Sequence, residues 1–286
     1  MRTIWIGIAA LFALAAVPAF GADMAVKSPP MAAPAPAFSW TGFYVGGNAG
    51  YGWQDQTVSY APNDFTSSGV TCGGAFGGTC VPPASFNVGG VLGGIQSGYN
   101  WQFNRQWVAG IEADFDWSGI KGAGTSNFTL GGATPGALSS FIGSEDINWF
   151  GTIRGRLGWL PTNSILVYGT GGFAYGHVDL NATLNSTVGA NAGVANGFGY
   201  QCDTGANCFV GRTSQTLDGW TAGAGAEYAI SSNVTLKVEY LYINLGRAAA
   251  VNSVALDGRA VTPSSFTANF STVSFNVIRA GANWKF

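Results

Sequence analysis

The segment 107–117, with the sequence WVAGIEADFDW, alternates apolar and polar side chains over its whole length. Its odd-numbered positions carry only Trp, Ala, Ile and Phe, while its even-numbered positions include three carboxylates. Successive side chains of a β-strand point to opposite faces, so this pattern predicts a strand with one uncharged face and one charged face. Two Trp residues bound the uncharged face at positions 107 and 117.

The same period of two recurs along the rest of the chain. Eight segments are predicted strands: 41–53, 89–103, 107–117, 147–160, 165–177, 217–230, 234–245 and 272–286. None of them contains Pro, which a hydrogen-bonded sheet excludes from its interior. For the segment 165–177 the sequence leaves open which face looks outward, because both faces mix Gly with apolar residues.

The connections between these segments alternate strictly in length. Short turns of polar residues occupy 104–106, 161–164 and 231–233, and the long connections are 54–88, 118–146, 178–216 and 246–271. Outer-membrane barrels have short periplasmic turns and long extracellular loops. The pattern therefore predicts an all-β fold, an eight-stranded antiparallel up-and-down transmembrane β-barrel with four long extracellular loops.

Two magnitudes favour lipid outside the barrel over a soluble barrel with an apolar interior. Ten residues of a strand tilted by about 40° rise roughly 25 Å, which is the height of the apolar band of an outer-membrane barrel. Only 9% of the residues are charged, whereas a soluble domain has about 25%. An Arg or Lys facing lipid at the midplane would cost about 2–4 kcal/mol, so the charged faces should line the lumen.

Two sets of residues follow from this orientation. The predicted lumen charge cluster comprises Glu112, Asp114, Asp116, Arg154, Arg156, Glu227, Lys237, Glu239 and Arg279, with Lys285 as a fifth base against five acids. The predicted aromatic girdle comprises Trp53, Trp101, Trp107, Trp117, Trp149, Trp159, Trp220 and Trp284. The cluster is interpreted either as a salt-bridged plug or as a polar path for small ions.

The N-terminus predicts export. Residues 1–21 have one early basic residue, an apolar stretch and small residues before position 22, which is typical of a secretory signal peptide. Residues 22–38 form a predicted Pro- and Ala-rich periplasmic linker, which leaves 39–286 for the barrel. With a net charge of −2, the chain lacks the basic surface of a nucleic-acid binder.

Few residues suggest chemistry. Cys72 and Cys80 share one long connection and Cys202 and Cys208 another, so an oxidising compartment favours two local disulfides that stiffen exposed loops. His177 is the sole histidine, and it is interpreted as a polar rim residue despite the nearby Asp179 and Ser186. Neither a catalytic site nor a cofactor or metal site is expected.

Four stretches of the chain resemble one known family. The mature start at 22–27, the opening strand SWTGFYVGGNAGYG at 39–52, YGTGGFAYG at 168–176 and the tail RAGANWKF at 279–286 are similar to the alphaproteobacterial outer-membrane immunogenic proteins, small porin-like barrels. The resemblance implies a surface-exposed barrel of the Gram-negative outer membrane without catalytic residues. The terminal Phe286 and Trp284 resemble the signal that the barrel-assembly machinery recognises.

These observations leave two main functional hypotheses. The first is a surface protein with a structural, envelope-integrity role and exposed antigenic loops, in contact with outer-membrane lipid and lipopolysaccharide. The alternative is a small porin-like channel for small polar solutes. A lipid-acting enzyme is the least favoured reading. The sequence fixes neither the natural ligand nor the oligomeric state.

Overall fold

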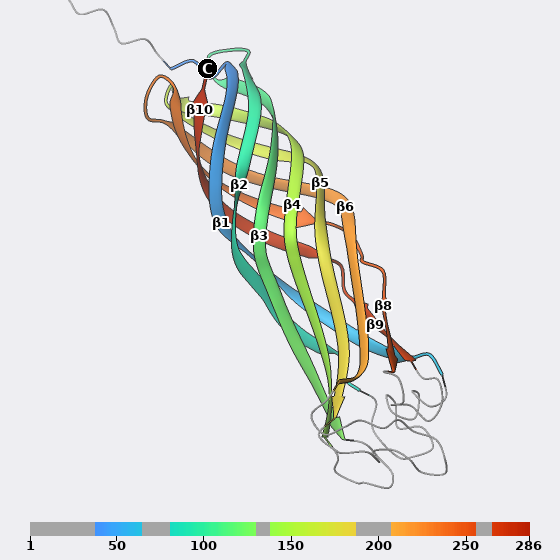
Figure 1. Cartoon of the computed structure of the whole chain (residues 1–286). Helices are drawn as coiled ribbons and strands as arrows, with labels where there is room; N and C mark the ends of the chain where they lie inside the picture. The colour runs from blue at the N-terminus through green and yellow to red at the C-terminus, as the bar shows by residue number, and fades with distance from the viewer. Residues whose placement is uncertain (1–37, 65–80, 130–137, 187–206, 256–264) are drawn as a thin grey trace, which may run out of the picture. The chain divides into compact units, whose positions relative to one another are not determined.

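The computed structural model describes residues 38–64, 81–129, 138–186, 207–255 and 265–286, and these form one antiparallel β-sheet (Figure 1). The predicted signal peptide and nearly all of the predicted linker lie outside the described residues. So do Cys72, Cys80, Cys202 and the side chain of Cys208, and the two disulfides remain predictions. No helix long and apolar enough to cross a membrane occurs in the described part of the chain.

The sheet contains ten strands in the described residues. They are β1 (Gly42–Pro62), β2 (Ala84–Gln102), β3 (Trp107–Thr129), β4 (Leu138–Thr162), β5 (Ile165–Ser186), β6 (Asn207–Ala229), β7 (Val234–Asn244), β8 (Val251–Ala255), β9 (Ser265–Phe270) and β10 (Ser274–Lys285).

Eight of these strands close into a ring. Strands β1 to β7 pair in chain order, β7 pairs with β10, and β10 pairs with β1, with Val45 opposite Trp284. The predicted eight-stranded barrel is therefore confirmed. At the end away from the C-terminus, β8 and β9 replace β7 and β10 in the wall, because β8 pairs with β6 and β9 pairs with β1 (Figure 1).

The strands extend far beyond the predicted boundaries. Large parts of the four connections predicted as loops are strands, including 54–62, 118–129, 138–146 and 178–186. The prediction of loops there was wrong because the alternation continues with its polarity reversed. Side chains on the outer face become polar and those on the inner face become apolar. These stretches therefore lack the apolar outer face and the charged inner face by which the membrane segments were recognised.

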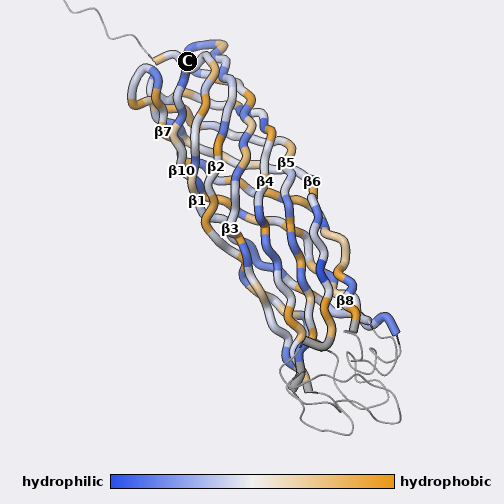
Figure 2. The backbone as a smooth tube through the Cα atoms, in the orientation of Figure 1, coloured by the Kyte–Doolittle hydropathy of each residue, from blue (hydrophilic) through white to orange (hydrophobic). Residues whose placement is uncertain are grey.

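Strand β1 displays this reversal in full. Up to Trp53 its exposed positions include Phe43, Val45 and Tyr51. Beyond Trp53 the exposed positions are Asp55, Thr57 and Ser59, and Val58 is fully buried between them. Figure 2 shows the resulting residue-by-residue alternation of hydropathy along the strands. The wall thus has an apolar outer face over one part of its length and a polar outer face over the rest.

A β-bulge in β4 changes which residues face inward. The register shifts between Ile147 and Trp149, and Asn148 is exposed. Ile147 is buried on the same face as Gly143 and Glu145, whereas Trp149 lies on the outer face. The period of two within the predicted strand 147–160 places Ile147 on the face of Trp149 and Asn148 on the face of Arg154; both assignments are wrong, because a simple period of two cannot pass through a bulge.

The structure also settles the faces of β5. Leu166, Tyr168 and Ala174 are buried inside the barrel, while Val167 and Phe173 are exposed on its outer wall. The even-numbered residues of β5 therefore form its inner face.

Candidate functional site

The charged residues predicted for the lumen lie together inside the barrel. We call them the ionic cluster: Glu112, Asp114, Asp116, Arg154, Arg156, Glu227, Lys237, Glu239 and Arg279. Strands β3, β4, β6, β7 and β10 supply them, and each is at most 5% exposed. Their placement follows from the strand period, because each strand contributes alternate positions to the interior.

Arg154 lies at the centre of the ionic cluster. Its guanidinium donates to Glu112 Oε1 at 2.6 Å, to Asp114 Oδ2 at 2.8 Å and to Glu239 Oε1 at 2.9 Å. It also donates to Thr152 Oγ1 at 2.8 Å. One side chain of β4 therefore joins strands on both sides of the lumen.

Arg279 joins the last strand to the third. Its guanidinium donates to Asp116 Oδ2 and Asp114 Oδ2, each at 2.7 Å, and to Glu239 Oε2 at 2.8 Å. Glu239 therefore accepts from both Arg154 and Arg279. Bonds of this kind, between ionised partners, are the strong ones in proteins.

Arg156 and Lys237 complete the ionic cluster. Arg156 donates to Glu227 Oε2 at 2.6 Å and its guanidinium carbon lies 4.2 Å from the centre of the Tyr168 ring. Lys237 Nζ donates to Glu112 Oε1 at 2.8 Å. All four cations of the ionic cluster are therefore paired with carboxylates.

The ionic cluster contains five acids and four bases. The sequence predicted a fifth base, Lys285, but its Nζ lies 5.5 Å from the centre of the Phe38 ring, and none of the ion pairs among the described residues includes it. Asp114 Oδ1 and Asp116 Oδ1 are buried without a hydrogen-bond partner. The ionic cluster therefore has one more carboxylate than it has cations.

Neutral side chains that the sequence analysis missed complete this layer. Tyr44 donates to Glu112 Oε2 at 2.7 Å, and Tyr168 donates to Glu239 Oε1 at 3.1 Å. Gln96 donates to Asn283, which donates to Glu227. Each residue occupies an inward position on its strand, so the period of two could have identified them once the charged face was assigned to the lumen.

Beyond the ionic cluster the interior is apolar and holds one further acid. Phe141, Phe150 and Phe275 are fully buried in this core. Glu145 is also fully buried, and its carboxylate accepts hydrogen bonds from Gln54 and Gln56. Burial raises the pKa of Glu145 above its ordinary value, and the bonds from the two Gln side chains lower it by less.

An aromatic residue packs into the opposite end of the barrel, where the short turns lie. Trp40 is 1% exposed and its indole N–H donates to the carbonyl oxygen of Asn163 at 3.1 Å. It packs with Val108, Leu160 and Leu166. The interior is therefore filled in three layers, which are apolar, ionic and apolar.

The eight Trp residues of the predicted girdle lie on the outer wall in two rows. Trp107 is paired in register with Trp159, and ten residues further along the same strands Trp117 is paired with Trp149. Trp101 and Trp284 lie at the level of the first row, and Trp53 and Trp220 at the level of the second. We call these rows the turn-side belt and the loop-side belt.

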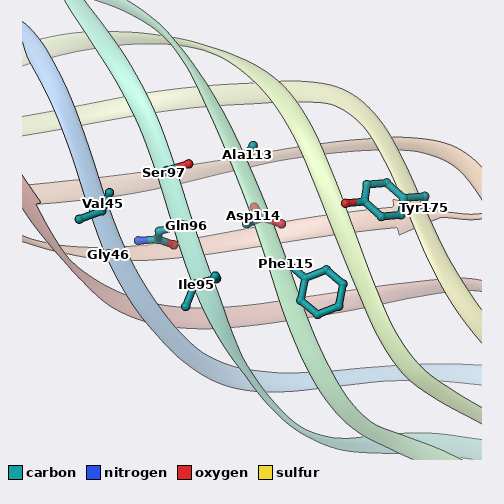
Figure 3. Close-up of a pocket in the computed structure, with 9 residues that line it drawn as sticks. All are labelled: Val45, Gly46, Ile95, Gln96, Ser97, Ala113, Asp114, Phe115 and Tyr175. Carbon is teal, nitrogen blue, oxygen red and sulfur yellow. The ribbon is translucent and has the colours of Figure 1, made fainter.

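A shallow hollow on the outer wall lies between the two belts (Figure 3). Its lining residues are Val45, Gly46, Ile95, Gln96, Ser97, Ala113, Asp114, Phe115 and Tyr175. Apart from Ser97, the outward side chains among them are apolar or aromatic, and Ile95 is 60% exposed. This hollow is part of the face that meets lipid rather than a water-filled active site.

His177 lies on the outer wall next to the loop-side belt, stacked on the Trp149 ring at 5.7 Å. Its Nε2 lies 3.0 Å from Ser214 Oγ and 3.8 Å from Asp179, while its Nδ1 faces Thr216 Oγ1. A hydrogen bond from Ser214, together with one from Asn148, lowers the pKa of Asp179. Ser186 ends β5, and its side chain lies outside the described residues.

Comparison with known proteins identifies the family. The profile of the outer membrane protein beta-barrel domain family matches residues 8–286. The chain belongs to this family. A relative from Brucella melitensis, a 31 kDa outer-membrane immunogenic protein, is 36% identical over 98% of both chains. A 22 kDa outer membrane protein of Rhizobium leguminosarum is 31% identical over 72% of this chain and 65% of its own.

Among solved structures, Ail of Yersinia pestis matches 86% of this chain and 99% of its own with 12% identity and a TM-score of 0.33. The family and its immunogenic relatives confirm the resemblance drawn from the sequence, and the protein is an outer-membrane β-barrel protein.

Proposed function

We propose that this outer-membrane barrel has a structural role in the envelope and carries surface-exposed segments on a barrel that is closed along its axis. The observation that supports this most directly is the ionic cluster, because nine charged side chains at most 5% exposed occupy the lumen between the two belts. An eight-stranded barrel has an interior just wide enough for side chains, unlike a porin of 16–18 strands.

Apolar layers on both sides of the ionic cluster support the same proposal. A solute that followed the axis would have to pass Trp40 at one end and the Phe141 and Phe266 side chains at the other, and all three are at most 1% exposed. Opening such a path would require the loss of packed aromatic contacts, for example the Phe141–Phe266 contact at 4.5 Å.

The surroundings of His177 support a role without catalysis. In a Ser-His-Asp triad the Ser and the Asp bind opposite nitrogens of the imidazole. Here Ser214 and Asp179 both face Nε2, while Thr216 occupies the other side. This arrangement gives the imidazole no carboxylate to orient it as a base for the serine.

The proposal also assigns partners by surface chemistry. Outer-membrane lipid would cover the apolar wall between the belts, and lipopolysaccharide would surround the loop-side belt. Phe286 and Trp284, exposed at the end of β10, would contact the barrel-assembly machinery during insertion.

Planar-bilayer conductance of the purified protein tests the proposal. We expect no reproducible conductance steps, measured beside an open porin as the positive control. Reproducible steps of nanosiemens size would overturn the closed barrel in favour of a porin-like channel. Deletion of the gene should make the envelope leaky to periplasmic markers, and an intact envelope would contradict the structural role.

A further inference from the structure

Strands β2 and β3 carry the hollow described above on the part of their outer face that lies in the membrane (Figure 3). Two of its lining residues are small and stand opposite each other in register, Ser97 of β2 and Ala113 of β3. Among their outward neighbours on the same strands, Ile95 is 60% and Ile111 is 67% exposed. Small side chains among protruding ones therefore produce this depression, which we call the wall hollow.

A second hollow lies over the same two strands, closer to the turn-side belt. Its lining residues are Tyr99, Trp101, Ala109, Gly110 and Ile111. Along β3, Ile111 stands between Ala109 of the second hollow and Ala113 of the wall hollow. This pair of strands therefore presents ridges and depressions to the membrane, and such a surface can interlock with another protein wall.

The wall hollow lies deep in the hydrocarbon. Along β2, Ser97 is four residues from Trp101 of the turn-side belt. It is also four residues from Gly93, which pairs with Trp117 of the loop-side belt. Four residues of a strand tilted by about 40° rise about 10 Å. Ser97 is therefore near the midplane, where the lipid offers only the hydrocarbon of its acyl chains.

A serine is unusual at this position. Among the outward positions between the belts on the eight described strands of the ring, Ser97 is the only serine or threonine. It is half-buried, and its hydroxyl has no hydrogen-bond partner among the described residues. The outward Tyr240, by contrast, donates to Asn276 Oδ1 at 2.6 Å. A hydroxyl without a partner is unfavourable in hydrocarbon, so a polar partner from outside this chain would stabilise Ser97.

Membrane symmetry indicates which partner can reach this depth. Copies of the protein insert with the same end outward, so a two-fold axis that relates two of them runs along the membrane normal. Such an axis brings each residue near it to its own equivalent at the same depth. Ser97 would therefore meet the Ser97 of a second copy, and a hydroxyl can both donate and accept. An acyl chain at this depth has no group that could do so.

We propose that the wall hollow is the centre of a dimer interface, in which Ser97 bonds to Ser97 of a second copy. The small side chains of Ser97 and Ala113 let the two walls approach closely, as small residues do between membrane-spanning helices. The protruding Ile95 and Ile111 pack around this bond and replace lipid at this face, while lipid covers the rest of the apolar band. Each barrel stays closed along its axis, so conductance tests the proposed function separately.

Sedimentation equilibrium of the full chain in density-matched detergent tests the dimer. We expect the wild type to sediment as a dimer and Ser97→Trp, which fills the wall hollow, to sediment as a monomer. Ser97→Ala keeps a small side chain and removes the hydroxyl. It should raise the dissociation constant of the dimer about 3- to 20-fold, as expected for the loss of a hydrogen bond between membrane-spanning segments.

The matched control lies at a similar depth on the opposite side of the ring. Ala224 is exposed on β6, four residues from Trp220 of the loop-side belt, and it stands opposite Gly169 of β5. Ala224→Trp should remain a dimer. A dimeric Ser97→Trp or dissociation by Ala224→Trp would overturn the proposal. So would a monomeric wild type, and lipid retained by that monomer in native mass spectrometry would assign the wall hollow to lipid.

Cysteine cross-linking locates the interface in membranes. A disulfide needs Cβ atoms about 3.5–4.5 Å apart, so Ser97→Cys should give a covalent dimer on oxidation because the two-fold axis passes beside this position. Ala224→Cys and the wild type, which has four cysteines of its own, should give none on a non-reducing gel. Equal yields from the two variants, or no product from Ser97→Cys, would contradict the interface. The change in gel mobility on heating verifies that every variant is folded.

Discussion

At the scale of single residues, Arg154 has the most extensive set of polar contacts in the barrel interior. It bonds to three carboxylates and one hydroxyl that come from β3, β4 and β7. None of these groups can turn toward water, because the whole layer is buried. A buried carboxylate that loses its cation keeps the full cost of desolvation, so the ionic cluster depends on every cation it contains.

Arg154→Ala should therefore lower the free energy of unfolding by about 3–5 kcal/mol, the usual cost of breaking a buried ion pair. Arg212→Ala is the matched control, because Arg212 is exposed on β6. Thermal unfolding in lipid-free detergent, followed by circular dichroism, measures both. Equal losses in the two variants would contradict a structural role for the ionic cluster.

Glu145 predicts a pH dependence of stability. Because burial raises its pKa, the folded protein binds this proton more tightly than the unfolded chain does. Its contribution is therefore favourable in acid and is lost as the pH rises from the ordinary Glu value of about 4.3 through the raised one. Glu145→Gln should remove this decline and raise the Tm at neutral pH.

The control for Glu145 is its neighbour. Asp146→Asn changes a half-buried residue on the outer wall. It should keep the decline and move it to slightly lower pH, because the charge of Asp146 contributes to the raised pKa of Glu145. The measurement is the Tm of the wild type, Glu145→Gln and Asp146→Asn as a function of pH. Identical profiles for the wild type and Glu145→Gln would show that Glu145 is not the titrating group.

At the scale of elements, the sequence predicted the membrane parts of the strands but not their continuation. Segment 107–117 is marked by three acids against apolar residues, and its placement in β3 matches the prediction. The exposed positions of the continuation 118–129 are Gly, Lys, Ala, Thr and Asn, residue types that also suit a loop. The path of the chain after β7 could not be foreseen either, because it depends on the contact of Val273 with Leu245 and Gly246, which are remote from it in sequence.

The glycines of β1 give a prediction about the inner and outer faces of one strand. A Cβ at Gly50 would clash with the Ile278 carbonyl oxygen and lie 2.7 Å from Arg279 Cβ, whereas a Cβ at Gly47 would meet nothing closer than 3.6 Å. Gly50→Ala should destabilise the barrel by about 1–3 kcal/mol through overpacking.

Gly47→Ala is the matched variant on the same strand. It should leave stability unchanged or raise it by about 0.4–1 kcal/mol, because the unfolded chain loses freedom. Urea unfolding of the protein in detergent compares the two, and a larger loss in Gly47→Ala would mean that the faces of β1 are assigned the wrong way round.

At the scale of the whole molecule, the barrel wall meets two solvents. Between the belts its outer face is apolar, and its interior holds the ionic cluster. Beyond the loop-side belt its outer face is polar, and its interior is an apolar core like that of a soluble protein. The hydrophobic effect therefore stabilises only the second part directly, while the first part depends on lipid.

Two exposed positions of β1 test this division. Ala49 lies between the belts and Ser59 lies beyond Trp53. Ala49→Arg should cost about 2–4 kcal/mol, as expected for a cation near the bilayer midplane, and Ser59→Arg should cost about 0–1 kcal/mol. Unfolding in phospholipid vesicles measures both, and similar costs would place the boundary between the solvents elsewhere.

The contacts of Arg279 have a consequence for biogenesis. This residue belongs to β10, the last strand among the described residues, yet its partners Asp114, Asp116 and Glu239 belong to β3 and β7. Without Arg279 in place, Asp116 would have no cation partner among the described residues, while Asp114 and Glu239 would keep Arg154. We therefore expect a chain that has not yet closed its ring through β10 to enter hydrocarbon less readily than the completed barrel, because a buried carboxylate without its cation keeps the cost of desolvation.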